Sequence, residues 1–117
     1  MQQITDRNHV LACTRGDRFE FRVSLTGMFS RPHFHMEDGD LAVFALMTHD
    51  QGFECALLKK TLTAEAVDEE GFLTIVLESE DTIGIPSGTY YYAVKLLKND
   101  PVGISTVIGR TKFIVME

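Results

Sequence analysis

"EDTIGIPSGTYYYAVKLL", Glu80 to Leu97, is the stretch that decides the fold class. Pro86 and Gly88 form a turn signal, and the residues after them alternate as a strand does. Tyr90 comes directly after the turn, where its hydroxyl can bond back to nearby backbone. With Tyr92, Val94 and Leu96 it should face the core, because strand side chains repeat every two residues. The stretch therefore predicts a turn that leads into a central β-strand.

Similar period-two runs lie on both sides of this stretch. In "FEFRVSL", residues 19–25, the apolar residues Phe19, Phe21, Val23 and Leu25 share one face, and "FLTIVLE", residues 72–78, has the same pattern. Turn signals such as "RGD", "EDGD", "DEEG" and "NDPVG" separate the runs. We expect strands near residues 9–14, 18–26, 41–49, 53–60, 62–67, 72–78, 89–98 and 104–116, and at most one helical turn near "ESEDTIG". This pattern predicts a single all-β domain over residues 1–117, a sandwich or small barrel.

"LAVFALM", Leu41 to Met47, departs from the alternation because it is apolar on both faces. In a two-layer sandwich only one face of a strand meets the core. A loop, another domain or another subunit must therefore cover the other face. We expect Phe44 and Leu46 to lie on that outer face and to form a protein interface; the opposite phase would instead place Val43 and Met47 outward.

Composition and charge limit the function classes. The 117 residues are 44% hydrophobic and 24% charged, as in ordinary globular domains. A net charge of −6 disfavours nucleic acid as the main partner, and residues 37–82 hold twelve Asp/Glu against two Lys. This acidic middle either solvates loops or complements the mildly basic ends in subunit contacts. We expect neither a signal peptide nor a membrane helix, and a protein made in the cytoplasm.

The two cysteines, Cys13 and Cys55, both alternate with apolar neighbours. We therefore expect two buried, unpaired thiols, as in a reducing compartment, although a disulfide would form if the fold brought them together.

"RPHFHMEDGD", Arg31 to Asp40, is the one candidate metal site. In an extended chain His33, His35 and Glu37 would point to one side, and two imidazoles with a carboxylate suit iron or zinc. However, three ligands from one strand spread over about 13 Å, whereas ligand donors lie about 2.1 Å from a shared ion. We expect a polar loop or edge here and no bound metal or other cofactor.

The other motifs do not form a catalytic centre. "RGD", Arg15 to Asp17, is the turn that leads into the strand at Phe19. The sequence contains no nucleophile elbow, phosphate-binding glycine loop or zinc-type cysteine pair. We therefore expect a protein that is not an enzyme. Sugar binding by a small sandwich would need exposed aromatic side chains, and of the three tyrosines only Tyr91 should face outward.

The quoted stretch 80–97 also resembles small immunoglobulin-like β-sandwich proteins of phages and prophages of Gram-positive bacteria. Proteins related to the N-terminal domain of the phage baseplate upper protein have a similar line, Asp-Thr followed by Pro-x-Gly-x-Tyr-x-Tyr, here Asp81 to Tyr92. "RGDRFEFRV" and "STVIGRTKFIVME" are similar to the early turn and the closing strand of that family. The middle of the chain departs from the pattern, with "DGDLAVFAL" and "RPHFHM".

The resemblance implies an immunoglobulin-like sandwich of about seven or eight antiparallel strands, with Pro86, Gly88 and Tyr90 in structural roles. It also implies a virion protein of the tail or baseplate, assembled in the bacterial cytoplasm and acting by self-association or by contact with other virion proteins. The alternative from another class is a carbohydrate- or receptor-binding module, so a glycan partner stays open. Neither nucleic acid nor membrane is expected as a partner.

Overall fold

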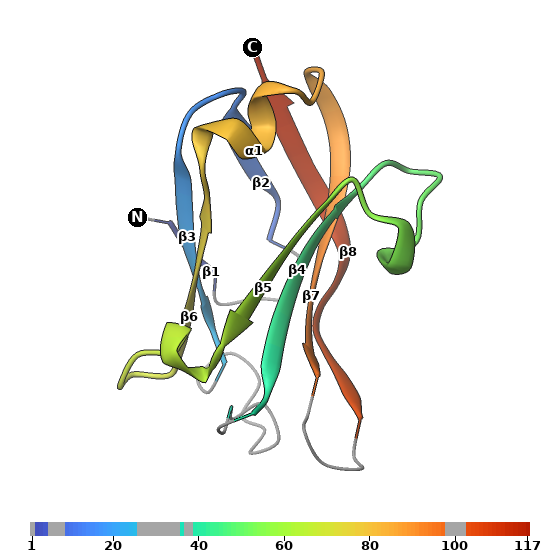
Figure 1. Cartoon of the computed structure of the whole chain (residues 1–117). Helices are drawn as coiled ribbons and strands as arrows, with labels where there is room; N and C mark the ends of the chain where they lie inside the picture. Colours follow the sequence, from blue (N-terminus) through green and yellow to red (C-terminus); the bar gives the residue numbers. More distant parts are fainter. Residues whose placement is uncertain (1, 5–8, 26–35, 37–38, 98–102) are drawn as a thin grey trace.

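The computed structural model describes residues 2–4, 9–25, 36, 39–97 and 103–117 (Figure 1). Over these residues the chain forms two β-sheets that face each other, so the all-β prediction is confirmed. The three-stranded sheet has the order β1 (Gln2–Ile4), β3 (Phe19–Ser24), β6 (Phe72–Leu77). The five-stranded sheet has the order β2 (Leu11–Thr14), β8 (Ile104–Met116), β7 (Gly88–Leu97), β4 (Leu41–Met47), β5 (Leu58–Thr63).

The core lies between the sheets and is aromatic at its centre. Phe21 of β3 approaches Phe44 of β4, with 5.7 Å between ring centroids. Phe44 also packs on Tyr92 at 6.0 Å and on Phe113 at 6.2 Å. All four side chains are fully buried, as are Val23, Leu73, Ile75, Leu77, Val94 and Leu96. The alternation in β3, β6 and β7 is therefore confirmed, except that Phe19 and Tyr90 lie half-buried at the edge of the core.

The N-terminal segment contributes a strand to each sheet. β1 pairs with β3 and β2 pairs with β8, and both pairings are parallel. The expectation of antiparallel strands throughout is therefore wrong at these two pairs. The physical reason is that neither strand pairs with the strand that follows it in the sequence, so no hairpin, which would make the pair antiparallel, joins β1 to β3 or β2 to β8.

The two strands predicted between β4 and β6 are wrong. We expected strands at 53–60 and 62–67, but the structure has the 3₁₀ turn η2 (Phe53–Cys55), one strand β5, and the 3₁₀ turn η3 (Ala64–Ala66). The amide of Cys55 donates to the carbonyl of Gly52, which closes the turn, and the ladder with β4 begins only at Leu58. Cys55 is consequently exposed, not a core residue as predicted, whereas Cys13 is buried and both thiols are free.

The two thiols should react very differently. Burial, together with the nearby carboxylate of Asp17, raises the pKa of the Cys13 thiol and disfavours its reactive thiolate. We expect one thiol per chain, that of Cys55, to react quickly with Ellman's reagent in native protein and two to react in denaturant. A Cys55→Ser variant should lose the fast phase, and a fast phase that survives this change would contradict the burial of Cys13.

The turn before β7 has the predicted structure. The hydroxyl of Tyr90 donates to the carbonyl of Pro86, four residues earlier, and Gly88 has a φ of +153°. The preceding helical turn is α1 (Ser79–Ile83), where a capping box joins Glu78 and Asp81. The carboxylate of Asp81 also pairs with the ammonium of Lys60 at 2.7 Å. This ion pair ties α1, which follows β6, to β5 at the edge of the five-stranded sheet. The structural roles of Pro86, Gly88 and Tyr90 thus have a direct geometric basis.

The "RGD" segment is a turn, as expected, and it packs against α1. Gly16 has a φ of +83°, and its amide donates to the hydroxyl of Thr82 at 2.9 Å. The Nε of Arg15 donates to the carbonyl of Ile83 at 2.9 Å. A Cβ on Gly16 would lie 2.8 Å from Cδ1 of Ile83, so the end of α1 rests directly on this glycine. The turn fixes the position of Ile83, which is 55% exposed to solvent.

Candidate outer-face site

Strand β4 is buried on both faces, but its phase is opposite to the predicted one. Phe44 pairs with Val94 and Leu46 pairs with Tyr92, so both side chains point into the core and neither is exposed. The prediction that Phe44 and Leu46 face outward is wrong, because the register of β4 with β7 places both side chains on the core side. Val43, Ala45 and Met47 lie on the outer face instead.

A short segment of the chain covers part of that outer face. η2 packs against β4, and the ring of Phe53 lies between two ammonium groups, those of Lys59 on β5 and Lys95 on β7. Ala45 pairs with Lys59 on the neighbouring strand β5 and with Ala93 on the other neighbour, β7. Both alanines are almost fully buried. The small methyl groups leave room for a covering side chain at this point of the sheet.

Arg110 of β8 holds the loop between β4 and η2. Its guanidinium donates to the carbonyls of Thr48, His49 and Gln51 at 2.8, 2.7 and 2.6 Å. It also lies over the ring of Tyr91, 4.8 Å from the centroid. Three charge-assisted hydrogen bonds to one loop fix the position of η2, and hence of Phe53, on the sheet.

Arg110→Ala should therefore cost about 2 kcal/mol of unfolding free energy, because three carbonyls lose a charged donor. Amide exchange in residues 48–55 should also become faster. Lys112→Ala removes a neighbouring exposed cation whose ammonium bonds to none of the described residues, and it should change little. Equal urea midpoints for the two variants would show that Arg110 does not hold the loop.

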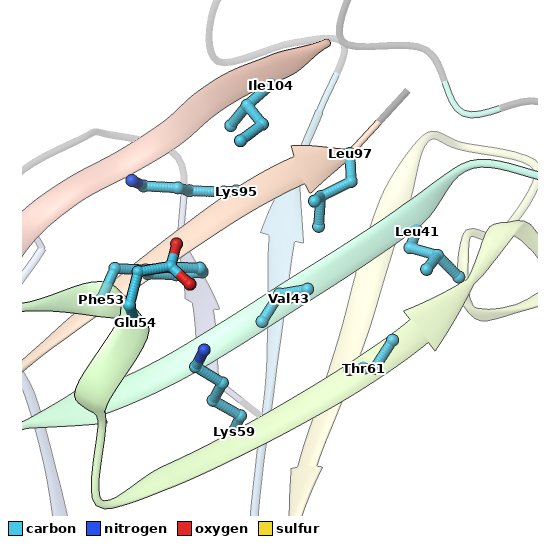
Figure 2. Close-up of a pocket in the computed structure, with 9 residues that line it drawn as sticks. All are labelled: Leu41, Val43, Phe53, Glu54, Lys59, Thr61, Lys95, Leu97 and Ile104. Carbon is cyan, nitrogen blue, oxygen red and sulfur yellow. The ribbon is translucent and has the colours of Figure 1, made fainter. Parts of the chain in front are cut away.

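Beyond η2 the outer face is hollowed into a pocket of about 300 Å³ (Figure 2). Its lining comes from β4, β5, β7, β8 and η2: Leu41, Val43, Phe53, Glu54, Lys59, Thr61, Lys95, Leu97 and Ile104. Leu41 pairs with Leu97, and Leu97 pairs with Ile104, so these three form one apolar row across the sheet. Leu41 is 37% exposed and Ile104 is 59% exposed. The pocket thus has an apolar end that is open to solvent.

The other end of the pocket is cationic. The ammonium of Lys95 is 4.4 Å from the Phe53 centroid and that of Lys59 is 5.2 Å from it. Neither ammonium has a carboxylate of the described residues within 4.0 Å, although Glu54 lines the same pocket. Figure 2 shows Leu41, Leu97 and Ile104 on one side of Val43, with Phe53 and both lysines on the other. The pocket can accept an apolar group with an anionic group beside it.

The charge of this face differs from that of the whole chain. On this face its strands and η2 present four cations, Lys59, Lys95, Arg110 and Lys112, and one carboxylate, Glu54, whereas Lys60 of β5 pairs with Asp81 of α1. The chain as a whole has a net charge of −6, so this face is more basic than the chain on average. The sequence placed the positive charge at the two ends of the chain, whereas the structure gathers these cations on one sheet face; subunit contacts between complementary surfaces stay a prediction.

The candidate metal ligands His33, His35 and Glu37 lie outside the described residues. In the part of the chain that the structure describes, no three His, Cys, Asp or Glu side chains are grouped so as to hold a metal ion. No helix among those residues is long and apolar enough to span a membrane.

Sequence reasoning missed Phe53, Lys59, Lys95, Leu97 and Ile104 as parts of one site. The usable signal was the two-sided apolar character of residues 41–47, which indicates a covered outer face. No protein-family model matches the sequence, and no curated protein matches it.

Proposed function

We propose that the protein is a non-enzymatic structural or assembly module of a phage or prophage virion, of the tail or baseplate type. It acts through protein–protein contacts made by the outer face of its five-stranded sheet. The observation that carries the proposal is the open apolar row of Leu41, Leu97 and Ile104 on that face, next to two lysines that pair with no carboxylate of the described residues. An apolar surface bordered by charge is typical of a contact site.

The strand order supports an immunoglobulin-like form of the sandwich, as the family resemblance implies. The five-stranded sheet places β8 and β7 next to β4 and β5, opposite the sheet of β1, β3 and β6. The Tyr90 hydroxyl bond to Pro86, next to a helical turn, is of the kind found at the corresponding corner of such domains. Immunoglobulin-like sandwiches serve many functions, so the virion assignment rests on the resemblance and the contact site together.

The carbohydrate-binding alternative has less support. A glycan ring stacks on an open aromatic face, but three half-buried aromatic side chains are each approached by a cation. Arg22 lies over Phe72, Lys95 over Phe53 and Arg110 over Tyr91, at 4.3, 4.4 and 4.8 Å from the ring centroids. These contacts occupy the surfaces that a sugar would use.

The test is whether the protein is part of a particle. Particles induced from the bacterium that carries the gene should contain it in a fixed ratio to the tail proteins, measured by quantitative mass spectrometry. Leu41→Asp with Ile104→Asp should fold but fail to be incorporated, whereas Leu57→Asp should be incorporated, because Leu57 is 47% exposed but outside the pocket. A protein abundant in the lysate and missing from particles would refute the proposal, and pocket-dependent retention on a glycan array would favour the alternative.

A further inference from the structure

In a contact between two copies of the chain, an exposed apolar side chain of one copy would fill the pocket of the other. Six large ones are exposed among the described residues, and two of them, Leu41 and Ile104, belong to the pocket. The others are Val10, Leu57, Ile83 and Met116. Of these, Ile83 ends the acidic helical turn α1, where the exposed Glu80 precedes it by three residues. No ion pair of Glu80 with another described residue is recorded.

Ile83 and Glu80 form a unit whose spacing fits the pocket. Side chains at positions i and i+3 lie on the same side of a helical turn, with Cβ atoms about 5–6 Å apart. In the pocket, Lys95 is two residues along β7 from the apolar row at Leu97, which is about 7 Å. An apolar side chain in the row would therefore place a carboxylate three residues away close to the ammonium groups.

The α1 unit is also held in place. Arg15 binds the carbonyl of Ile83, and Gly16 binds the hydroxyl of Thr82 and touches the Ile83 side chain. Asp81 is fixed by Lys60 and by the capping box with Glu78. A contact group that is rigid before binding loses little conformational entropy when it docks.

We infer that the pocket binds α1 of a second copy of this chain, with Ile83 in the apolar row and Glu80 between Lys59 and Lys95. This inference rests on the proposed function and names its contact partner. Charge complementarity selects α1, because the pocket face is basic and α1 is acidic. α1 and the apolar row lie at opposite ends of the sandwich, so the contact is head-to-tail and repeats into a ring or filament (Figure 1).

A charge exchange between two variants tests this contact in the full-length protein. Variant one is Lys59→Glu with Lys95→Glu, and variant two is Glu80→Lys. Sedimentation velocity at low salt should show that the wild type associates as its concentration rises. Each variant alone should associate at least about tenfold more weakly, because attraction becomes repulsion. A mixture of the two should associate again, because each then meets a partner of opposite charge at both surfaces.

Matched variants show that the effect is local. Lys112→Glu lies on the same face outside the pocket, and Glu69→Lys lies on an exposed turn away from α1; both should associate as the wild type does. Ile83→Ala, with the charges unchanged, should weaken association. The altered side chains are on the surface or line the open pocket, and urea midpoints close to that of the wild type would confirm that each variant is folded.

Three results would overturn the inference. A wild type that remains monomeric at all concentrations excludes the second copy as the occupant. Association of the double lysine variant alone that equals or exceeds that of the wild type would exclude the contact with α1, since this variant places carboxylates opposite Glu80. Association that is lost with Leu41→Asp but is insensitive to Glu80→Lys and to mixing would leave the outer face as a contact surface and exclude α1. None of these results alters the particle test, so failure of this inference and failure of the proposed function can be told apart.

Discussion

Phe44→Ala is expected to lower the free energy of unfolding by about 4 kcal/mol. Phe44 has no exposed surface and lies among three other aromatic rings, those of Phe21, Tyr92 and Phe113. Truncation would leave a cavity between the two sheets that the paired strand β4 cannot close. Urea denaturation followed by fluorescence or circular dichroism would measure the loss.

Val43→Ala is the matched control on the opposite face of the same strand. Val43 lines the outer pocket and is 7% exposed, so its truncation should cost about 1 kcal/mol, much less than that of Phe44. If Phe44→Ala were milder than Val43→Ala and abolished self-association, the strand would have the phase first predicted from the sequence.

Tyr92→Ala is expected to cost about 4 kcal/mol, through the loss of a fully buried ring and of its hydrogen bond. The Tyr92 hydroxyl donates to the carbonyl of His9, which is 83 residues away in the chain. This bond ties the segment before β2 to the centre of β7. Tyr92→Phe keeps the ring and should cost about 1 kcal/mol, and it should also speed amide exchange in β2.

The pair of Tyr92 variants separates packing from hydrogen bonding. Tyr90→Phe is the control, because Tyr90 is half-buried and its hydroxyl binds only four residues away, to Pro86. It should leave exchange in β2 unchanged. Faster exchange in β2 with Tyr90→Phe but not with Tyr92→Phe would contradict the role given to the Tyr92 hydroxyl.

The inward face of β3 could be predicted because its other face is polar: Phe21 and Val23 alternate with Glu20 and Arg22. In β6 the face of Leu73, Ile75 and Leu77 is wholly apolar, whereas the other face includes Thr74. β4 offers no such contrast, since Leu41 to Met47 are apolar at every position. Its phase is set by pairing with β7, where Phe44 meets Val94, and that register is a long-range property.

Local turns limited the prediction between β4 and β6. Phe53 and Cys55 alternate as strand residues do, yet a single 3₁₀ turn holds them on the outer face with help from Arg110. A contact between residues 51 and 110 leaves no trace in the local pattern. The pocket was missed for the same reason, because its lining comes from β4, β5, β7, β8 and η2 and meets only once the sheet has formed.

The accessibility of the outer face inside an assembled particle tests the central claim most directly. A cysteine at Thr61, in the pocket, with Cys55→Ser to remove the exposed native thiol, provides the probe, since Cys13 is buried. Glu69→Cys in the same background marks an exposed turn outside the pocket. The measurement is the rate of maleimide labelling at both positions, in dilute protein and in purified particles. The account predicts that both label quickly in dilute protein and that only the Thr61 position becomes slow in particles; equally fast labelling of the two positions in particles would contradict it.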